Sequence, residues 1–442
     1  MKEPKINIGI ISGKEINFVL HGKFLIENSD RIYSGIFKAK RDGENIIITQ
    51  NKIFLDVKND IVFYPSNFDE ESFVLKNVII GQNFHWEQKE KESFSGSLRL
   101  KSDGNNIHAI NTLPLENYLT SVISSEMNPD ASIEFLKAHA VISRSWLLAQ
   151  LKSKQAKNLS PQIETENEII KWYDRTEHTL FDVCADDHCQ RYQGISKVHN
   201  NAAIEAVHKT RGIVLEYNNE ICDARFSKCC GGITESFENV WADTNIPYLT
   251  SKPDYKFAPD NYNTNFDVEQ NARRWIMRTP ISFCNCDNDE VLSHVLTASD
   301  IQTKDFYRWK VEYSQEEISK IIFDKTKIDF GFILDLIPVK RGKSSRIIKL
   351  KIIGSKRSIT IGKELEIRRV LSKHHLYSSA FVVDKECDEN KVPIKFTLYG
   401  AGWGHGVGLC QIGAAVMGEK GYAFDEILSH YFSNTRLKKI YE

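Results

Sequence analysis

The spacing of apolar residues changes several times along the chain, and each change predicts a different kind of secondary structure. Residues 1–110 contain short apolar runs separated by Gly, Asn and Asp, which is typical of strands and turns. Residues 113–151 have apolar positions three and four residues apart, the spacing of helices, interrupted by a turn at residues 128–130. Residues 305–395 mix strand-like runs with two helical stretches. The pattern predicts an α+β fold.

The same changes divide the chain into four parts. We expect a β-rich part at residues 1–110, a core at 111–275, an inserted second α/β unit at 276–395, and a glycine-rich segment at 396–442 that completes the core. Residues 152–174 are polar with little apolar periodicity, so we expect them to form a loop.

The first predicted helix places a carboxylic acid among leucines. Leu115, Leu119, Val122 and Glu126 follow one another at helical steps and fall on one face. Glu126 should therefore lose hydration, which raises the pKa of a carboxyl group and keeps it protonated, ready to donate a proton near neutral pH. The alternative is a structural glutamate that caps the helix or pairs with a cation.

The second predicted helix, residues 133–148, is apolar around most of its circumference and should be buried. Lys137 and Arg144 interrupt it two turns apart, about 10 Å along one face. Together with Glu126 they suggest a polar cleft. In the alternative interpretation, both cations extend to solvent from apolar stems.

A candidate metal site lies between residues 176 and 194. His178, Cys184 and Cys189 occur within twelve residues, with His188 and three aspartates nearby. Thiolate and imidazole are zinc ligands, and three of them with an open fourth position would suit a catalytic zinc. Alternatively, Cys184 and Cys189 form a disulfide or are buried thiols, and His178 is a surface residue.

Two glycine-rich segments are candidate binding elements. The first, FSKCCGGITE, contains Ser227, Gly231 and Gly232, where missing side chains would let a ligand approach the main chain. The second, YGAGWGHGVGLCQIG, has five glycines at alternate positions around His405, including Gly406, and Gln411 opens a helix.

An ordinary strand would not leave one face without side chains for ten residues. The second segment does not match a phosphate-binding loop. Either something lies against its bare face, or it is a tight turn packed under another backbone with His405 satisfied in the core.

Composition narrows the possible partners. The 442 residues carry a formal net charge of -1, with 41% hydrophobic and 26% charged residues. We therefore expect no nucleic-acid partner, and no apolar run is long enough for a transmembrane segment. The first twenty residues carry Glu and Lys throughout, so no signal peptide is visible.

Nine cysteines, several in close pairs, favour metal binding or free thiols over a disulfide framework.

Several of these strings resemble signatures of the SpoIID/LytB family. LPLENYLTSVISSEM followed by EFLKAHAVISRSW is similar to its opening signature, and the glycine run around His405 to its closing one. FSKCCGGITE and the Cys189-Gln190-x-Tyr192 stretch are also similar to family elements. The chain departs from the pattern at Asn128, which separates Met127 from Pro129, and at Cys229, where the family often has Ser or Thr. The resemblance covers most of the chain and implies a SpoIID-like interrupted catalytic domain.

The resemblance implies a lytic transglycosylase, a carbon-oxygen lyase that cuts the MurNAc-GlcNAc bond of peptidoglycan strands stripped of stem peptides. Glu126 would be its general acid and base, leaving 1,6-anhydroMurNAc ends. His178, Cys184 and Cys189 would hold a zinc ion, structural or at the active site. An extracytoplasmic or periplasmic location would follow. The implied substrate-binding residues are Lys137, Arg144, Ser227, Gly231, Gly232, His405, Gly406 and Gln411.

Two other functions are compatible with the sequence. A LytB-type amidase enhancer would bind glycan strands without cutting them and would have a cell-wall amidase as its partner. A zinc hydrolase would use the His178 cluster, although two thiolates make zinc a weak Lewis acid.

Overall fold

The computed structural model describes residues 2–50, 53–81, 88–126, 130–153, 162–173, 178–186, 188–198, 201–296 and 305–442. The chain divides into two compact units, which are described separately below. The first unit comprises Met1–Arg144, Glu177–Val214 and Lys438–Glu442, and the second comprises Ser145–Thr176 and Leu215–Leu437.

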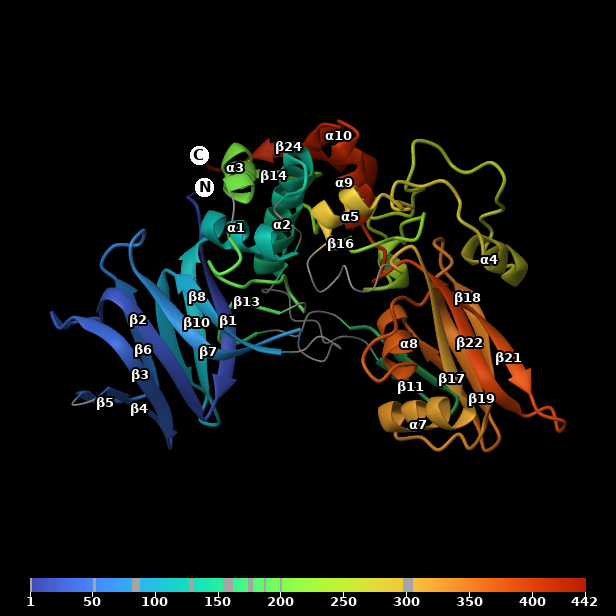
Figure 1. Cartoon of the computed structure of the whole chain (residues 1–442), viewed down its shortest axis with the longest axis horizontal. Helices are drawn as coiled ribbons and strands as arrows, with labels where there is room; N and C mark the ends of the chain where they lie inside the picture. Colours follow the sequence, from blue (N-terminus) through green and yellow to red (C-terminus); the bar gives the residue numbers. More distant parts are fainter. Residues whose placement is uncertain are drawn as a thin grey trace. The chain divides into compact units, whose positions relative to one another are not determined.

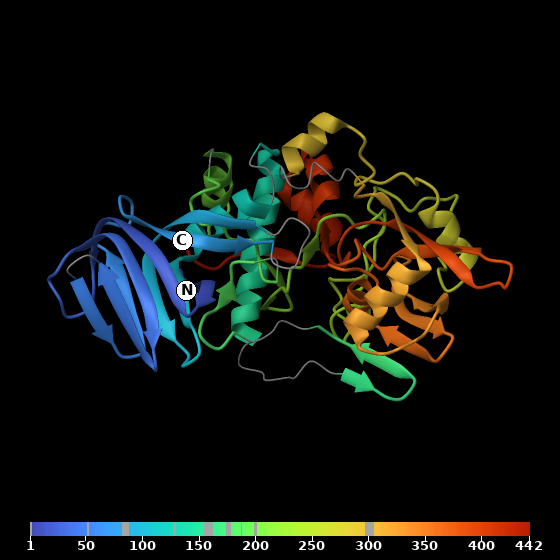
Figure 2. The same ribbon diagram turned by 60° about the horizontal axis from the view of Figure 1, so that its bottom comes forward.

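A large antiparallel sheet dominates the first unit, as the blue strands in Figures 1 and 2 show. Its order is β13-β1-β10-β9-β6-β2-β3-β4-β5, with β7 pairing with β2 and β8. Alternate side chains are buried, and the rings of Phe18 and Phe37 stack at 5.3 Å. The expected β-rich N-terminal part is thus confirmed. Its strands are β1 (Lys5–Gly13), β2 (Glu15–Leu25), β3 (Tyr33–Asp42), β4 (Asn45–Gln50), β5 (Ile53–Val57), β6 (Asp60–Pro65), β7 (Ser72–Ile80), β8 (Gln88–Ser95), β9 (Ser97–Ser102) and β10 (Ile107–Pro114).

The two predicted helices follow this sheet directly. α1 (Leu115–Glu126) continues from β10, and α2 (Ile133–Ser153) begins after the turn. β13 (Val183–Cys184) adds to the sheet edge in parallel with β1, and α3 (Asn201–Lys209) packs against α1. The expected turn falls partly outside the described residues, because residues 127–129 are not among them.

The second unit contains a five-stranded sheet of order β11-β12-β20-β19-β18 and a three-stranded sheet of order β17-β22-β21. α7 begins with a capping box between Ser314 and Glu317, as its Ser and Glu residues predict. The elements are β11 (Gln162–Glu164), β12 (Glu168–Lys171), β17 (Arg308–Ser314), α7 (Gln315–Thr326), β18 (Ile333–Arg341), β19 (Ile347–Gly354), β20 (Ser358–Gly362), α8 (Glu364–Val370), β21 (Phe381–Cys387) and β22 (Pro393–Ala401).

The three-stranded sheet contributes to two apolar cores near the start of β21 and the end of β22, whereas β17 and the rest of β21 carry exposed charged residues. Phe381 and Leu398 belong to a core with α7 and α8, while Val382 belongs to a second core around Trp275 of α4 (Glu269–Ile276). Neighbouring positions alternate between the two cores because successive side chains of a strand point to opposite faces. β22 leads directly into the glycine-rich segment around His405.

Shorter elements complete the chain. The expected loop at 152–174 is wrong in part, because β11 and β12 form there and β12 pairs with β20. No described helix has both the length and the apolar character needed to cross a membrane. The remaining elements are β14 (Ile213–Tyr217), β15 (Glu220–Ile221), β16 (Phe226–Ser227), the 3-10 helix η1 (Phe237–Asn239), α5 (Asp289–Val295), β23 (Leu409–Cys410), α9 (Gln411–Glu419), α10 (Phe424–Tyr431) and β24 (Arg436–Lys439).

Candidate functional site

Glu126 is the last residue of α1 and is partly exposed, whereas Leu115, Leu119 and Val122 on the same face are fully buried. One carboxylate oxygen of Glu126 accepts a hydrogen bond from the backbone N–H of Arg191 at 2.9 Å. This bond places the carboxylate beside the segment that carries the candidate zinc ligands. The Glu126 side chain is therefore held at the edge of the helix pair and remains partly exposed to solvent.

Arg144 has a different environment from the one expected for a sugar-binding residue. Its side chain is fully buried, and its Nε and Nη2 atoms donate to the two oxygens of Glu116 at 2.9 and 2.6 Å. Its Nη1 atom donates to the carbonyl of Ile213 at 2.9 Å. Glu116 also accepts from the hydroxyl of Tyr441 at 2.5 Å. These contacts give Arg144 a role in holding the first unit together, and its contact with substrate stays a prediction.

Lys137 is partly buried near the start of α2 and pairs with Glu134 one turn earlier. Both side chains are partly exposed, so a substrate group could replace Glu134 as the partner of Lys137 at a small cost in free energy. Contact between Lys137 and a sugar therefore remains open as a prediction.

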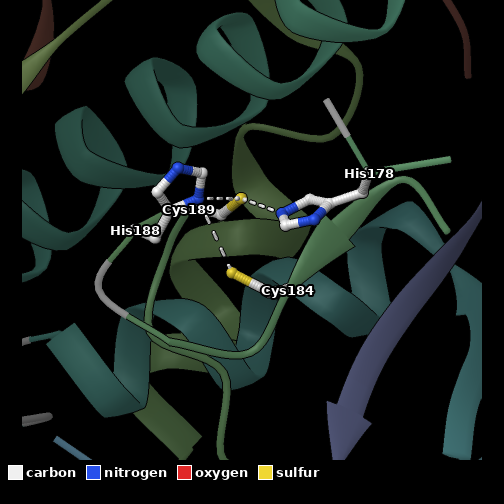
Figure 3. A group of neighbouring side chains, drawn as sticks. All are labelled: His178, Cys184, His188 and Cys189. Atoms are coloured by element: carbon white, nitrogen blue, oxygen red, sulfur yellow. Dashed lines mark hydrogen bonds between the residues drawn. The ribbon is translucent and has the colours of Figure 1, made fainter. Parts of the chain in front are cut away.

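The predicted metal ligands His178, Cys184 and Cys189 lie together in the first unit, as Figure 3 shows. β13 carries Cys184 and is fixed to β1 by a bond from Ala185 N–H to the Gly9 carbonyl at 3.0 Å. The structure adds His188 as a fourth candidate ligand. The sequence contained a signal for it, since His188 follows Cys184 by four residues.

Buried polar side chains anchor the segment after Cys189. Gln190 accepts from the hydroxyl of Tyr118 at 3.1 Å and donates to the carbonyl of Ser143 at 3.3 Å. The hydroxyl of Tyr192 donates to Asn111 on β10 at 2.5 Å, and its ring stacks on Tyr118 at 5.2 Å. The Cys-Gln-x-Tyr stretch therefore fixes the position of the last thiol ligand.

The ligand distances fit zinc. With Zn–S of about 2.3 Å and Zn–N of about 2.0 Å, a tetrahedral ion holds sulfur and nitrogen about 3.6 Å apart. The Sγ atom of Cys189 is 3.5 Å from Nε2 of His178 and 3.6 Å from Nδ1 of His188. Hydrogen bonding by Cys189, His178 and His188 lowers the pKa of the Cys184 thiol despite its burial. Both cysteines are free thiols, so the disulfide alternative is wrong.

The two glycine-rich segments pack against each other within the second unit. Cys229 and Trp403 exchange two backbone hydrogen bonds, at 3.1 and 2.8 Å. A Cβ atom on Gly231 would lie 2.9 Å from the nitrogen of Gly402, and both residues have positive φ. These glycines therefore allow two backbones to touch, which is the packing alternative expected from the sequence.

Glu235 and Arg346 hold this pair of segments in place. The carboxylate of Glu235 is fully buried and accepts from the backbone N–H groups of Lys343 and Ser344, both at 3.1 Å, and from the Ser344 hydroxyl at 2.6 Å. Arg346 donates to the Ser344 hydroxyl at 2.9 Å and to the carbonyl of Gly404 at 2.9 Å.

The bare face at Gly406 is occupied by the Arg346 side chain, because a Cβ atom there would lie 2.5 Å from the guanidinium carbon. His405 is partly exposed, and its Nδ1 atom accepts from the backbone N–H of Val407 at 3.0 Å. Burial, with the charges of Arg225 and Arg346, lowers the pKa of His405 well below its usual range. The imidazole is therefore neutral near pH 7.

The other predicted binding residues of the second unit have different environments. The ring of Trp241 lies edge-on to His405 at 5.1 Å, under the guanidinium of Arg225 at 4.0 Å. The buried Ser227 hydroxyl has no hydrogen-bond partner among the described residues. Gln411 is buried at the start of α9. Gly232 packs against the ring of Trp275.

The part of the chain that contains the helix pair and the cysteine–histidine cluster matches a known protein family. The model of the stage II sporulation protein family, SpoIID, matches residues 103–217 of this chain. A domain of unknown function (DUF8618) matches residues 235–408.

The similarity extends to individual proteins. The amidase enhancer of Bacillus subtilis (strain 168) is 26% identical over 325 residues, which are 72% of this chain. The chain spans only 40% of that relative's length. Stage II sporulation protein D of the same organism is 23% identical, covering 75% of this chain and 76% of that protein. An uncharacterized protein of Brachyspira hyodysenteriae (strain ATCC 49526 / WA1) is 24% identical, covering 88% and 81% respectively.

Proposed function

We propose that this protein is a peptidoglycan lytic transglycosylase that cleaves the MurNAc-GlcNAc bond of glycan strands. The observation that carries the proposal is the partly exposed Glu126 carboxylate, held at the end of α1 by the Arg191 N–H. The SpoIID family includes lytic transglycosylases, and the resemblance of LPLENYLTSVISSEM to the family's opening signature implies that Glu126 is the catalytic acid. A peptidoglycan substrate would require an extracytoplasmic or periplasmic location.

One carboxyl group is sufficient for this reaction. Protonated Glu126 would donate its proton to the glycosidic oxygen as the C–O bond breaks, so the GlcNAc end leaves as an alcohol. The resulting carboxylate would then take the proton from the C6 hydroxyl of MurNAc as that oxygen attacks C1. The product is a 1,6-anhydro ring, and no water is consumed. A hydrolytic glycosidase would need a second carboxylate.

The remaining residues would position the acid and the strand. A zinc ion held by His178, Cys184, His188 and Cys189 would supply a fixed crosslink, which would keep the Arg191 N–H directed at Glu126. Because these four residues would fill all positions of a tetrahedral site, we propose a structural role for the ion. In our assignment Lys137 contacts the glycan and Arg144 supports the fold.

In the second unit, we propose that His405 contacts sugar hydroxyl groups through its neutral ring. The Trp241 ring, which lies edge-on to His405, and the Ser227 hydroxyl, which has no hydrogen-bond partner among the described residues, support this assignment, because aromatic rings and hydroxyl groups are typical of sugar sites. Gly231, Gly232 and Gly406 would act indirectly by allowing the close backbone packing, and Gln411 by opening α9.

The test is digestion of purified glycan strands, with and without stem peptides, followed by mass spectrometry of the products. We expect anhydro ends from wild type with stripped strands, and loss of product by a factor of about 100 or more in Glu126→Gln, the range of general acid catalysis. Glu205→Gln on α3, which removes an exposed carboxylate, is the matched control and should retain activity. Equal activity in Glu126→Gln would exclude the mechanism.

The similarity to an amidase enhancer favours a second candidate function, glycan binding that assists a cell-wall amidase. In that case wild type would yield no product, and strands would bind Glu126→Gln as tightly as wild type. A zinc hydrolase is less favoured than either, because His188 would fill the coordination position that a reacting water needs.

A further inference from the structure

Four buried side chains of the second unit, to which the proposed function gives no role, converge at one point. The ligand atoms of Cys230, Asp254, Cys284 and Cys410 all lie within 4.8 Å of one another, and each residue is at most 2% exposed. They come from four separate segments: the loop after β16, the following loop, the loop after α4, and β23.

The distance between two of the sulfur atoms distinguishes a metal site from a disulfide. The Sγ atoms of Cys230 and Cys284 are 3.6 Å apart, and all nine cysteines are free thiols. A disulfide would bring the atoms to about 2.05 Å. Two thiolates on a tetrahedral zinc ion, with Zn–S of about 2.3 Å, lie about 3.8 Å apart. The observed spacing matches the zinc geometry.

The candidate ligands also have the supporting hydrogen bonds that metal ligands usually receive. The two oxygens of Asp254 accept from the hydroxyl of Tyr431 at 2.5 Å and from the backbone N–H of Cys284 at 2.8 Å. The sulfur of Cys410 accepts from the backbone N–H of Cys230 at 3.2 Å. Since a carboxylate offers about four lone-pair positions, Asp254 retains capacity to bind an ion.

The surroundings leave room for the cluster and offset its charge. A Cβ atom at Gly413 would lie 2.4 Å from an Asp254 oxygen, so only glycine allows the carboxylate into this position. Cys410 directly precedes α9, whose positive end favours a thiolate. The guanidinium groups of Arg346 and Arg308 donate to the carbonyls of Cys230 and Gly231, which places positive charge beside the cluster.

We propose that Cys230, Asp254, Cys284 and Cys410 hold one zinc ion in a closed structural site. The ion would tie together four segments that have little regular structure of their own. β16 and β23 pair over only two residues, and so short a ribbon is marginal alone. By joining them, zinc would stabilise the base of the glycine-rich segment that carries His405.

The test measures zinc in the full-length protein purified with reductant from zinc-supplemented medium. The Cys184→Ser/Cys189→Ser variant disables the cluster in the first unit and leaves these four residues intact. We expect it to retain one zinc per chain by elemental mass spectrometry. After replacement of zinc by cobalt(II), we expect the intense visible absorption of a tetrahedral thiolate complex.

Adding Asp254→Asn or Cys284→Ser to that variant should remove the zinc, with circular dichroism reporting whether each protein folds. Cys230 alone is a poorer target, because the adjacent Cys229 also approaches Cys284 and Cys410. Cys387→Ser, at an exposed thiol of β21, is the matched control and should leave the zinc content unchanged.

Two results would overturn the proposal. One is a Cys184→Ser/Cys189→Ser protein that contains no zinc and shows no cobalt–thiolate absorption. The other is a Cys230–Cys284 disulfide found by peptide mapping of protein purified without reductant. Neither result depends on whether the protein cleaves glycan, so failure here leaves the proposed function to its own test.

Discussion

Replacing Arg144 by Met tests whether this residue supports the fold or binds substrate. The substitution keeps a long apolar stem but removes a guanidinium that donates to Glu116 at 2.9 and 2.6 Å. Glu116 would remain buried, with the Tyr441 hydroxyl at 2.5 Å and the Gly212 N–H at 3.4 Å as its remaining neutral donors. Neither donor carries a charge to offset the carboxylate.

Removing one partner of a buried ion pair costs about 3–5 kcal/mol in free energy of unfolding, because the other charge is left uncompensated. The Tyr441 and Gly212 donors should limit the loss to about 3 kcal/mol. For a unit of this size each kcal/mol lowers Tm by about 2–4 °C, so we expect a fall of about 6–12 °C.

Urea and thermal unfolding, followed by circular dichroism, measure this loss. Lys137→Met on the same helix removes a more exposed ion pair and should cost about 1 kcal/mol or less. The double variant Arg144→Met/Glu116→Gln should be more stable than Arg144→Met alone, because it buries no unpaired charge. An Arg144→Met protein with wild-type stability but weakened glycan binding would refute this reasoning and restore Arg144 as a ligand-binding residue.

Two further predictions concern the second unit. Glu235→Gln should lower the free energy of unfolding in urea by about 3 kcal/mol, because an amide would face N–H groups that now donate to a carboxylate. The control Glu316→Gln, at an exposed position, should change it little. Equal stabilities of the two variants would exclude the role given to Glu235. Burial and the charge of Lys252 lower the pKa of His430 to about 4. The folded state therefore binds fewer protons than the unfolded one. This contribution to stability is full above pH 6.5 and falls by about 3 kcal/mol as the pH drops to 4. His430→Phe should remove that part of the pH dependence and the exposed His374→Asn should not; an unchanged pH profile in His430→Phe would contradict the assignment.

The sequence predicted the local features of the first unit well. The helix ending at Glu126 and the spacing of His178, Cys184 and Cys189 both depend on residues close together in the chain. The fourth ligand candidate, His188, was missed as a ligand although it adjoins Cys189. Arg144 was placed correctly on a buried helix, but its partner Glu116 lies 28 residues away, and periodicity does not reveal such pairs.

The second unit was harder to predict because its contacts are distant in sequence. Alternating glycines indicated a bare face, yet what covers Gly406 is Arg346, sixty residues earlier. Cys230 and Cys410 are 180 residues apart, so no local spacing marks their cluster as a metal site. The strands β11 and β12 form in a polar segment because β20 pairs with β12, which is a tertiary effect.

The central claim is that one carboxyl group moves a proton from acid to sugar and back without using water. Digestion of stripped glycan strands in heavy-oxygen water, followed by mass spectrometry of the new ends, tests it directly. We predict ends from wild type that carry no heavy oxygen and are one water lighter than hydrolysis products, and no new ends from Glu126→Gln. Heavy oxygen in the wild-type products, or undiminished cleavage by Glu126→Gln, would contradict the account.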